Sequence, residues 1–489
     1  MENNNYNYDL IVIGAGPGGA EAAAESVKYG MRTALIESYK VGGTCLNRGC
    51  IPTKALMRSS DAYREIREYE DLGIDLGGTA VYPDGEGGIK PNYERIYKRK
   101  EAVLATLREG ISKGLKRGKV DLIYGHGRIV GEHEVEVVIN PAVEGEAVHI
   151  GEAETLTADK IIIATGSRAA MPPVKGTDLP GVITSTELLE LEGAPYDTLA
   201  IVGGGVIGAE FATVFNDLGT KVGILEATDR LIPRMDKELG RSLKTALQQQ
   251  GIEIHTSAAV SEITAADQKN RDGSFKLNIN FNEKGGECKI TADKVLISTG
   301  RRPNTDDLFD DEIAEKYNFI GERRFMNVNE AGRTSCAAIY AIGDIVPGMQ
   351  LAHTAAAQAR NAVADINGHS LPDDMSVVPA CIYSRPEIAS VGMTQDEAKR
   401  KDIDIITKKY AMGANGKTVL EGLGRGFIKI VARKSDEVII GAQLMCGRAT
   451  DLAGELALAI RNGLTLGDIA STIHPHPTFT EAIGEASRL

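Results

Sequence analysis

Two cysteines, Cys45 and Cys50, lie close together in the segment 42–54, which reads GGTCLNRGCIPTK. Neighbouring thiols of this kind can form a disulfide that opens and recloses during turnover. A metal site is less favoured, because such sites more often use two-residue spacing with a second ligand pair, and the sequence shows no second pair. Two ordinary buried cysteines are the remaining interpretation. The surrounding glycines and the glycine-rich pattern at 14–19 favour redox use of the pair.

The spacing of the two cysteines requires an irregular backbone. In a regular helix they would stand about 7.5 Å apart along the axis, beyond normal disulfide reach. Gly49 and Pro52 allow the distortion, and Pro52 suits the first turn of a following helix. Cys50 would then lie near a helix N-terminus, where the helix dipole stabilises a thiolate. Lys54 follows one turn later, and it is either an exposed lysine or an active-site residue that pairs with Glu210.

A second candidate centre is the C-terminal segment 473–481, which reads IHPHPTFTE. Its two histidines could bind a metal, be structural, or supply an acid/base. The prolines hold an extended path and no Cys or carboxylate cluster adjoins, which disfavours a metal. A dithiol substrate must lose a proton before it attacks a disulfide, and imidazole titrates in the right range. Glu481 is the local candidate for a carboxylate that orients the ring.

These residues need a scaffold, and the N-terminal segment predicts one. An apolar strand at Leu10–Ile13 runs into a glycine-rich turn and then into an Ala-rich helix. Gly14 permits the tight turn, Gly16 admits a pyrophosphate, and Gly19 lets helix and strand pack closely. Glu37 ends the next strand and can bind ribose hydroxyls. The segment is therefore a full dinucleotide-binding fingerprint.

The same plan recurs after a strand at Leu199–Val202. Glu226 ends its second strand, and in both copies the acid lies 18 residues after the last glycine. A carboxylate there accepts a hydrogen bond from the ribose 2′-OH and repels a 2′-phosphate, so the second nucleotide site favours NAD over NADP. Arg230 lies nearby, and an arginine could instead bind the 2′-phosphate of NADP. The glycines of this turn are Gly203, Gly205 and Gly208.

A further pair of similar segments indicates duplication and an insertion. The segments 159–166 and 293–300 are both buried strands that end in a Thr-Gly turn, at Gly166 and Gly300, and each would close one nucleotide-binding unit. The first unit would resume and include 339–344, where Asp344 either reaches a ribityl or ribose hydroxyl or belongs to a plain turn.

The fold class predicted is α/β, with two Rossmann-like domains, the second inserted in the first, and a C-terminal α+β domain. We expect a long helix over 91–116, a hairpin at 427–432 and 438–445, and a helix at 449–462. The predicted boundaries are 1–168, 169–301, 302–350 and 351–489.

Composition excludes several function classes. The 489 residues carry a net charge of -13, which argues against nucleic acid and anionic membranes. No apolar run approaches the roughly 18 residues that span a bilayer, and residues 1–8 resemble neither a secretory signal nor a transit peptide. We therefore expect a cytoplasmic protein. Four isolated cysteines are expected to be buried apolar side chains: Cys288, Cys336, Cys381 and Cys446.

On these motifs the chain resembles the pyridine nucleotide–disulfide oxidoreductases over residues 8–485. The signatures are Gly42–Lys54, Gly203–Glu210, Ile339–Asp344, Leu351–His353, and His476–Thr478 with Glu481. The resemblance implies FAD in the first nucleotide site, formed by the domain parts 1–168 and 302–350, and NAD in the inserted domain 169–301. It also makes 351–489 a dimerisation domain.

The resemblance also implies roles for individual residues. Cys45 would exchange with the substrate and Cys50 would contact the flavin. Lys54 would lie near the flavin ring, paired with Glu210, and His476 would enter the active site of the partner subunit in a homodimer. The residues assigned to FAD are Gly14, Gly16, Gly19, Glu37, Gly43, Thr44, Lys54, Gly166, Asp344 and His353. Those assigned to NAD are Gly203, Gly205, Gly208, Glu226 and Gly300.

Within the family the residues favour the dihydrolipoamide dehydrogenases. Val206 stands where glutathione reductases typically have a gating Tyr. The His-Pro-His-Pro segment resembles the His-x-His-Pro of dihydrolipoamide dehydrogenases, and residues 486–489 add no extra thiols of the kind that some other family members carry. Gln358 departs from the pattern, since the dihydrolipoamide enzymes often have Glu at this position. The implied partner is a lipoyl-bearing protein of a 2-oxoacid dehydrogenase complex or the glycine cleavage system. Two alternatives stay open: a related disulfide reductase, for glutathione or another small disulfide, that uses NAD(P)H, and a flavoprotein subunit without thiol chemistry.

Overall fold

The computed structural model describes residues 6–69, 71–74, 89–139, 153–190 and 196–489. The chain forms two compact units, each assembled from separate segments and described here by itself. The first unit is Met1–Ala55, Tyr97–Ala170 and Arg301–Met375. The second unit is Leu56–Ile96, Met171–Gly300 and Ser376–Leu489.

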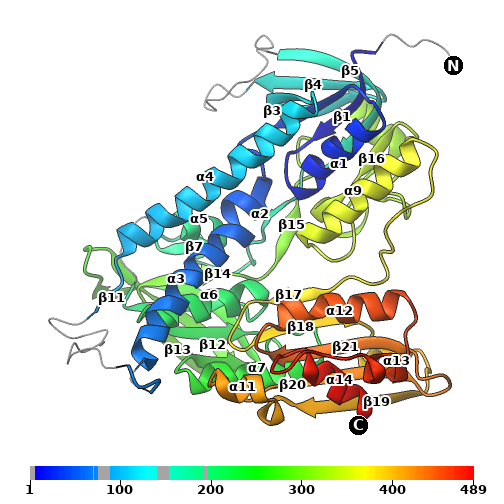
Figure 1. Ribbon diagram of the computed structural model, residues 1–489. Helices are drawn as coiled ribbons and strands as arrows, with labels where there is room; N and C mark the ends of the chain where they lie inside the picture. Colours follow the sequence, from blue (N-terminus) through cyan, green and yellow to red (C-terminus); the bar gives the residue numbers. More distant parts are fainter. Residues whose placement is uncertain (1–5, 70, 75–88, 140–152, 191–195) are drawn as a thin grey trace. The chain divides into compact units, whose positions relative to one another are not determined.

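A parallel sheet forms the centre of the first unit, with neighbouring strands in the order β3-β2-β1-β5-β16. Its central strands are near-continuous apolar runs, as expected for strands covered on both faces. The helices α1 (Pro17–Lys28) and α9 (Ala352–Ile366) lie side by side on this sheet (Figure 1). The strands are β1 (Tyr8–Ile13), β2 (Thr33–Glu37), β3 (Asp121–Gly131), β5 (Ala153–Ile163) and β16 (Ile339–Ala341). An antiparallel strand, β4 (Glu134–Ile139), joins β3 to β5.

The second unit contains a parallel sheet with the same plan, in the order β10-β9-β8-β14-β7. An antiparallel ribbon of β11, β12 and β13 again precedes the strand that closes the sheet. The predicted duplication and insertion are therefore confirmed, because β16 returns to the first sheet beside β5. The strands are β7 (Val182–Thr184), β8 (Thr198–Val202), β9 (Lys221–Glu226), β10 (Glu253–Thr256), β11 (Ala258–Lys269), β12 (Phe275–Glu283), β13 (Gly286–Ala292) and β14 (Lys294–Ile297).

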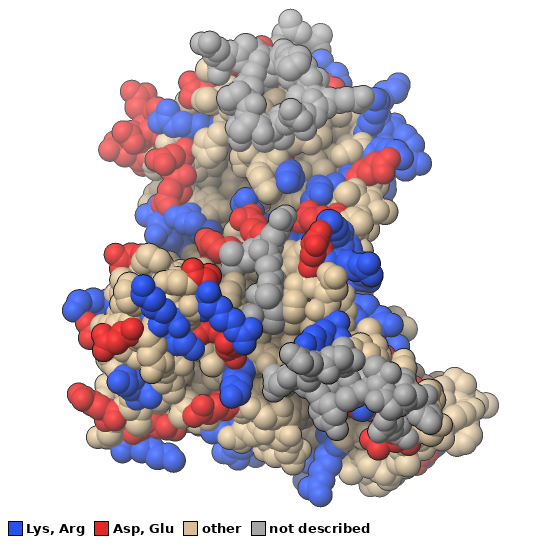
Figure 2. All heavy atoms as spheres, turned by 90° about the vertical axis from the view of Figure 1, so that its left-hand side faces the viewer, with Lys and Arg blue, Asp and Glu red and all other residues tan. Residues whose placement is uncertain are grey.

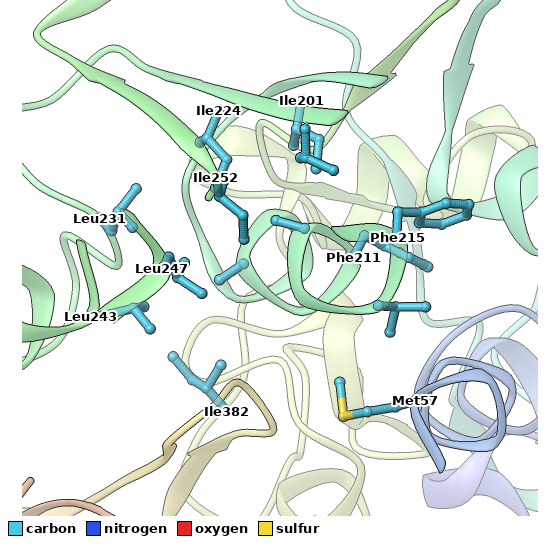
Figure 3. Packing of buried hydrophobic residues seen from close by; sticks show 14 of the residues in the cluster. Met57, Ile201, Phe211, Phe215, Ile224, Leu231, Leu243, Leu247, Ile252 and Ile382 are labelled. Atoms are coloured by element: carbon cyan, nitrogen blue, oxygen red, sulfur yellow. The ribbon is translucent and has the colours of Figure 1, made fainter. Parts of the chain in front are cut away.

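Apolar side chains from the sheet, from two helices and from a further strand cover α6 (Val206–Asp217) in the second unit (Figure 3). Ile201 and Ile224 reach it from the sheet, and Met57 reaches it from α3 (Cys50–Glu68). Leu243 and Leu247 come from α7 (Lys237–Gln249), and Ile382 from β17 (Ala380–Ile382). Burial on several sides agrees with the run of consecutive buried residues at 208–215, which is more than one apolar stripe.

The C-terminal part of the second unit is an antiparallel sheet, in the order β17-β18-β21-β20-β19, covered by helices. The predicted hairpin is confirmed as β20 and β21, and the predicted helix as α12. The elements are β18 (Glu387–Gly392), β19 (Ile405–Ala411), β20 (Phe427–Arg433), β21 (Ile439–Cys446), α12 (Ala449–Arg461), α13 (Leu466–Ser471) and α14 (Glu481–Arg488). The predicted long helix is α4 (Tyr93–Arg117).

The structure differs from two expectations. The C-terminal domain was expected from 351, but α9 packs through Ala359, Ala362 and Val363 on the first sheet, so residues up to Met375 belong to the first unit. Of the four isolated cysteines, Cys336 and Cys446 are buried, whereas the other two are partly exposed because they lie on strands that are only half covered. The two partly exposed cysteines are Cys288 and Cys381.

Lys and Arg side chains are interspersed with Asp and Glu side chains over the surface visible in Figure 2. Mixed charges of this kind keep a surface well solvated. Among the helices of the described residues, none has the length and apolarity that crossing a bilayer requires.

The two glycine-rich turns have matching geometry. Gly14 has φ 103° and Gly203 has φ 111°, a region that favours glycine. A Cβ on Gly19 would lie 1.8 Å from the Gly14 carbonyl oxygen, and one on Gly208 would lie 2.1 Å from that of Gly203. The close helix–strand packing predicted for Gly19 is therefore confirmed, and Gly208 repeats it.

We expect Gly19→Ala to destabilise the first unit by about 3 kcal/mol, because the added Cβ meets backbone that side-chain rotation cannot move aside. The measurements are the thermal unfolding temperature and the flavin absorbance per chain. Gly110→Ala is the control, since that helical glycine has nothing within 4 Å of an added Cβ. An equal unfolding temperature for the two variants would contradict the packing argument.

Candidate active site

The cysteine pair lies at a break between two helices. Helix α2 (Gly43–Arg48) ends before Gly49, which has φ −154° and ψ −111°, and α3 begins at Cys50. The irregular backbone predicted from the spacing is therefore confirmed. Cys50 occupies the first position of α3, where the unpaired N–H groups and the helix dipole favour a thiolate.

The side chains of Cys45 and Cys50 interact directly. A hydrogen bond to the Cys50 side chain raises the pKa of the Cys45 thiol, with burial and charge on Cys50 adding to the effect, while Lys54 lowers it. Both cysteines carry free thiols here, Cys45 partly buried and Cys50 exposed. Two thiols that compete for one charge can share a thiolate when reduced and can close to a disulfide when oxidised.

Asn47, between the two cysteines, holds the redox turn in place. Its side-chain amide donates to the carbonyl oxygens of Val41 at 3.1 Å and Gly43 at 2.9 Å, and more weakly to Lys40 at 3.3 Å. Its oxygen accepts a hydrogen bond from Arg108 of α4 at 3.0 Å. Because Asn47 is buried, these bonds fix the path of the chain that enters α2.

The first nucleotide site is a cradle of close backbone approaches. A Cβ on Gly43, which has φ 54°, would lie 2.6 Å from the Gly16 Cα. The first turn of α2 therefore lies against the turn that begins α1, and the exposed Thr44 follows there. Backbone N–H groups of helix N-termini bind phosphate well, so this cradle fits the pyrophosphate of FAD.

The acids at the strand ends make matching contacts in the two copies. Glu37 accepts the N–H groups of Ala15 at 2.7 Å and Tyr39 at 2.8 Å, and Glu226 accepts those of Gly204 and Thr228, both at 2.7 Å. Burial raises the pKa of Glu37, and the backbone N–H groups oppose that rise. Each acid thus connects its glycine-rich turn to the end of the second strand, which is where a ribose would bind.

The basic residue near the second acid has other partners. The guanidinium of Arg230 donates to the Asp229 carboxylate at 2.9 Å and to the Pro233 carbonyl at 3.0 Å. Its side chain is 20% exposed. The two bonds hold Arg230 away from a role as a phosphate partner, so the site fits NAD better than NADP.

Asp344 lies in a polar cluster of the first unit. It accepts a hydrogen bond from the Ser167 hydroxyl, and Arg301 Nε stands 3.6 Å from its carboxylate. Burial lowers the pKa of Arg301, while Asp344 and Cys50 oppose that change. Arg301 therefore adds positive charge to the surroundings of the thiols.

Four further residues belong to the nucleotide-binding parts of the chain. The side-chain oxygen of Gln358 accepts the Gly343 N–H at 2.7 Å, an acceptor role that a carboxylate could also fill. His353 is exposed in the first turn of α9. Gly166 and Gly300 both have positive φ, at 69° and 131°, after the strands that close the two sheets.

Glu210 is buried in the first turns of α6 and is 4% exposed. Its carboxylate accepts the backbone N–H of Tyr383 at 3.0 Å. Lys54 belongs to the first unit and Glu210 to the second, so their pairing stays a prediction.

The two C-terminal histidines differ in their surroundings. The His476 side chain is 79% exposed, and its Nδ1 lies 2.8 Å from Glu481 Oε1. The second Glu481 oxygen accepts the Thr478 N–H at 2.8 Å. His474 is largely buried and lies 3.0 Å from Glu455, so it is structural. Glu481 therefore contacts the exposed histidine, and its role in orienting a catalytic imidazole stays a prediction.

Several residues that make contacts in this site are not identified by the motifs found in the sequence. Asn47 carried a signal, since an amide inside a Cys-x₄-Cys loop suits turn-holding bonds. Arg108, Ser167 and Arg301 had none, because each acts through a partner far away in the sequence. Among the described residues, no group of three or more His, Cys, Asp and Glu side chains is arranged to hold a metal ion.

We expect Asn47→Asp to loosen the redox turn, since a carboxylate keeps the acceptor but loses the donor to three carbonyl groups. Losing one such buried donor costs about 1–3 kcal/mol. The unfolding temperature should fall, and the dithiothreitol concentration that reduces half of the Cys45–Cys50 disulfide should change. Asn462→Asp is the control, since its one bond to Leu458 is exposed. Equal shifts in the two variants would contradict the anchoring role.

Comparison with known proteins places the chain among relatives over nearly its whole length. Residues 8–359 match the family described as Pyridine nucleotide-disulphide oxidoreductase, and residues 378–487 match its dimerisation domain. The chain is 38% identical over 486 residues to a dihydrolipoyl dehydrogenase of Bacillus subtilis (strain 168), covering 98% of this chain and 97% of that protein. It is 36% identical over 482 residues to a dihydrolipoyl dehydrogenase of Geobacillus stearothermophilus, covering 98% and 96%.

Solved structures with the same fold come from two other bacteria. The HOCl-induced flavoprotein disulfide reductase RclA of Escherichia coli has a TM-score of 0.81 and 27% identity, covering 99% of this chain and 100% of that one. LpdA of Mycobacterium tuberculosis has a TM-score of 0.84 and 25% identity, covering 98% and 99%.

Proposed function

The chain belongs to the pyridine nucleotide–disulfide oxidoreductases, FAD- and NAD-dependent enzymes, and we propose that it oxidises protein-bound dihydrolipoamide to lipoamide with NAD⁺ as the final acceptor. The observation that carries the proposal is the direct interaction of Cys45 with Cys50 at the start of α3. The full-length similarity to dihydrolipoyl dehydrogenases supports dihydrolipoamide as the substrate. The substrate is a lipoyl group of a 2-oxoacid dehydrogenase or glycine cleavage protein, and the compartment is the cytoplasm.

The exchange begins with the Cys45–Cys50 disulfide and a substrate dithiol. A substrate thiolate attacks Cys45 Sγ, which forms a mixed disulfide and releases Cys50 as a thiolate. The second substrate thiol then attacks the substrate sulfur of that mixed disulfide, which releases lipoamide and the Cys45 thiolate. Two electrons have passed to the protein, and FAD and NAD, when bound at the two glycine-rich turns, would supply the path that removes them.

His476 is the proton acceptor for the substrate thiols. With Nδ1–H donating to Glu481, the ring presents the lone pair of Nε2 to the thiol. A hydrogen bond from the Thr478 backbone, followed by the contact with His476, holds the pKa of Glu481 below its usual range. Glu481 therefore remains a carboxylate and stabilises the imidazolium that forms.

The working form is a homodimer in which His476 acts on the thiols of the partner subunit. Support comes from the match of 378–487 to a dimerisation domain. It also comes from large apolar side chains that the C-terminal domain exposes, which is typical of a surface that is covered by a partner. These side chains are Val419, Leu420, Leu458 and Ile473.

Steady-state NAD⁺ reduction with dihydrolipoamide tests the proposed function directly. We expect His476→Gln to lower this turnover by about 10²–10⁴-fold, the range for a lost general base, while FAD stays bound. His369→Gln, which alters an exposed histidine of the first unit, is the control and should keep full activity. Near-normal turnover of the His476 variant would exclude the proposed role.

The choice between NAD and NADP tests the related-reductase alternative. We expect Glu226→Ala to lower kcat/KM for NAD⁺ by about 10-fold or more, since a lost hydrogen bond to a ribose hydroxyl removes binding energy. Arg230 should not compensate, because its guanidinium is already bonded to two other groups. Activity with lipoamide, glutathione disulfide, NADH and NADPH is measured side by side. A wild-type preference for NADPH and glutathione disulfide would favour the alternative.

A further inference from the structure

A guanidinium of the second unit joins two helices to the turn that follows β17. Arg385 binds Asp217 with both of its terminal nitrogens, at 3.0 and 2.7 Å, and one of these nitrogens also binds Asp61. Asp217 is the last residue of α6, and Asp61 lies in α3. This two-pronged geometry gives arginine pairs their orientational specificity.

The turn that carries Arg385 is fixed at several other points. The Tyr383 N–H donates to Glu210 Oε1 at 3.0 Å. The Ser384 hydroxyl donates to the Pro386 carbonyl at 2.9 Å, and the Gln250 side chain donates to the Arg385 carbonyl at 2.8 Å. The N–H that meets Glu210 is therefore two residues away from the guanidinium that meets Asp217.

Arg385 is also the main counter-charge for a buried carboxylate. The Asp217 side chain is 5% exposed. Burial raises the pKa of Asp217, and the hydrogen bonds and charge of Arg385 oppose that rise. Arg64 adds a weaker charge effect, and Arg67 donates to the Asp217 backbone carbonyl at 3.0 Å. Without Arg385 the buried carboxylate would have to take up a proton or water, and α6 and the turn would shift apart.

The position of α6 bears on Glu210, because both carboxylates belong to this one helix. Glu210 lies two turns before Asp217, and the same short turn of chain contacts both residues. Met57 of α3 and Ile382 of β17 also pack against the helix (Figure 3), and the polar bonds add directional contacts to this apolar packing.

We propose that Arg385 is a positioning residue for the reaction: it locks the 383–386 turn onto α6 so that the Tyr383 N–H holds the Glu210 carboxylate in its working orientation. The inference rests on the proposed function only through the prediction that Glu210 belongs to the catalytic machinery. An N–H that donates to a carboxylate makes a charge-assisted bond, and its loss changes both the direction and the charge distribution of that carboxylate. Misplacement of a catalytic group by about 1 Å can cost about 10²-fold in rate.

A double-mutant cycle on the holoenzyme tests the proposal. The variants are Arg385→Gln, Arg385→Lys, Glu210→Gln and the Arg385→Gln/Glu210→Gln pair. Arg433→Gln is the control, because its exposed pair with Asp436 lies in the same unit. The readout is the rate at which dithiothreitol generates the thiolate-to-flavin absorbance under anaerobic single-turnover conditions. Dithiothreitol makes this readout independent of the natural substrate, so a failed turnover with dihydrolipoamide would count only against the proposed function.

We expect Arg385→Gln to slow this step by about 10-fold, Arg385→Lys by less, and the control by less than about 2-fold. In the Glu210→Gln background, Arg385→Gln should add less than about 2-fold, since both changes act on one carboxylate. Equal losses with and without Glu210, or no loss at all, would overturn the proposal.

A milder variant covers the case in which Arg385→Gln does not fold. Asp61→Asn removes the negative charge of one of the two partners and leaves the buried Asp217–Arg385 pair intact. We expect it to slow the step by about 2–5-fold in the native background and by a smaller factor in the Glu210→Gln background. A loss that is the same in both backgrounds would again overturn the positioning role.

Discussion

The contact between Cys45 and Cys50 depends on a single interruption of helical backbone. Helical rise would carry the two residues apart, so the chain must leave one helix at Gly49 and begin the next at Cys50. The interruption brings the side chains together and gives Cys50 the unpaired N–H groups of a helix start. Asn47 and Arg108 hold the preceding loop in place. Redox chemistry at this position is thus a consequence of backbone geometry as much as of thiol reactivity.

The two nucleotide-binding sheets share the same glycine and glutamate positions around their first turn. In each, a glycine with positive φ turns the chain and a second glycine admits the helix against the strand. A buried glutamate then accepts the N–H of the residue after the first glycine and that of the residue two positions after itself. Since both acids make the same bonds, any difference in the cofactor that the two turns bind must come from the residues around the turns. In the first unit these are the start of α2 and the Asp344 cluster.

Charged pairs in the second unit divide into bonds that orient a reactive group and bonds that support a helix. Glu481 orients His476, and its bond to the Thr478 N–H keeps the carboxylate itself in place. The buried Arg385–Asp217 pair joins α6 to the turn that contacts Glu210. A buried ion pair contributes little net stability relative to an apolar replacement, so its value here lies in fixing a geometry.

The sequence by itself determined the strand–turn–helix pattern of both nucleotide sites, the duplication, the C-terminal hairpin and the irregular backbone at the cysteine pair. Those features depend on local periodicity, on glycine and on spacing, which are readable without knowing any distant contact. Only the tertiary structure decided that His474 is buried beside Glu455 while His476 remains exposed, and that α9 belongs to the first unit. It alone brought Arg385 to Asp61, 324 residues away in the sequence. The physical reason is that burial and polar partners depend on how separate segments pack, and the sequence near one side chain carries no record of that packing.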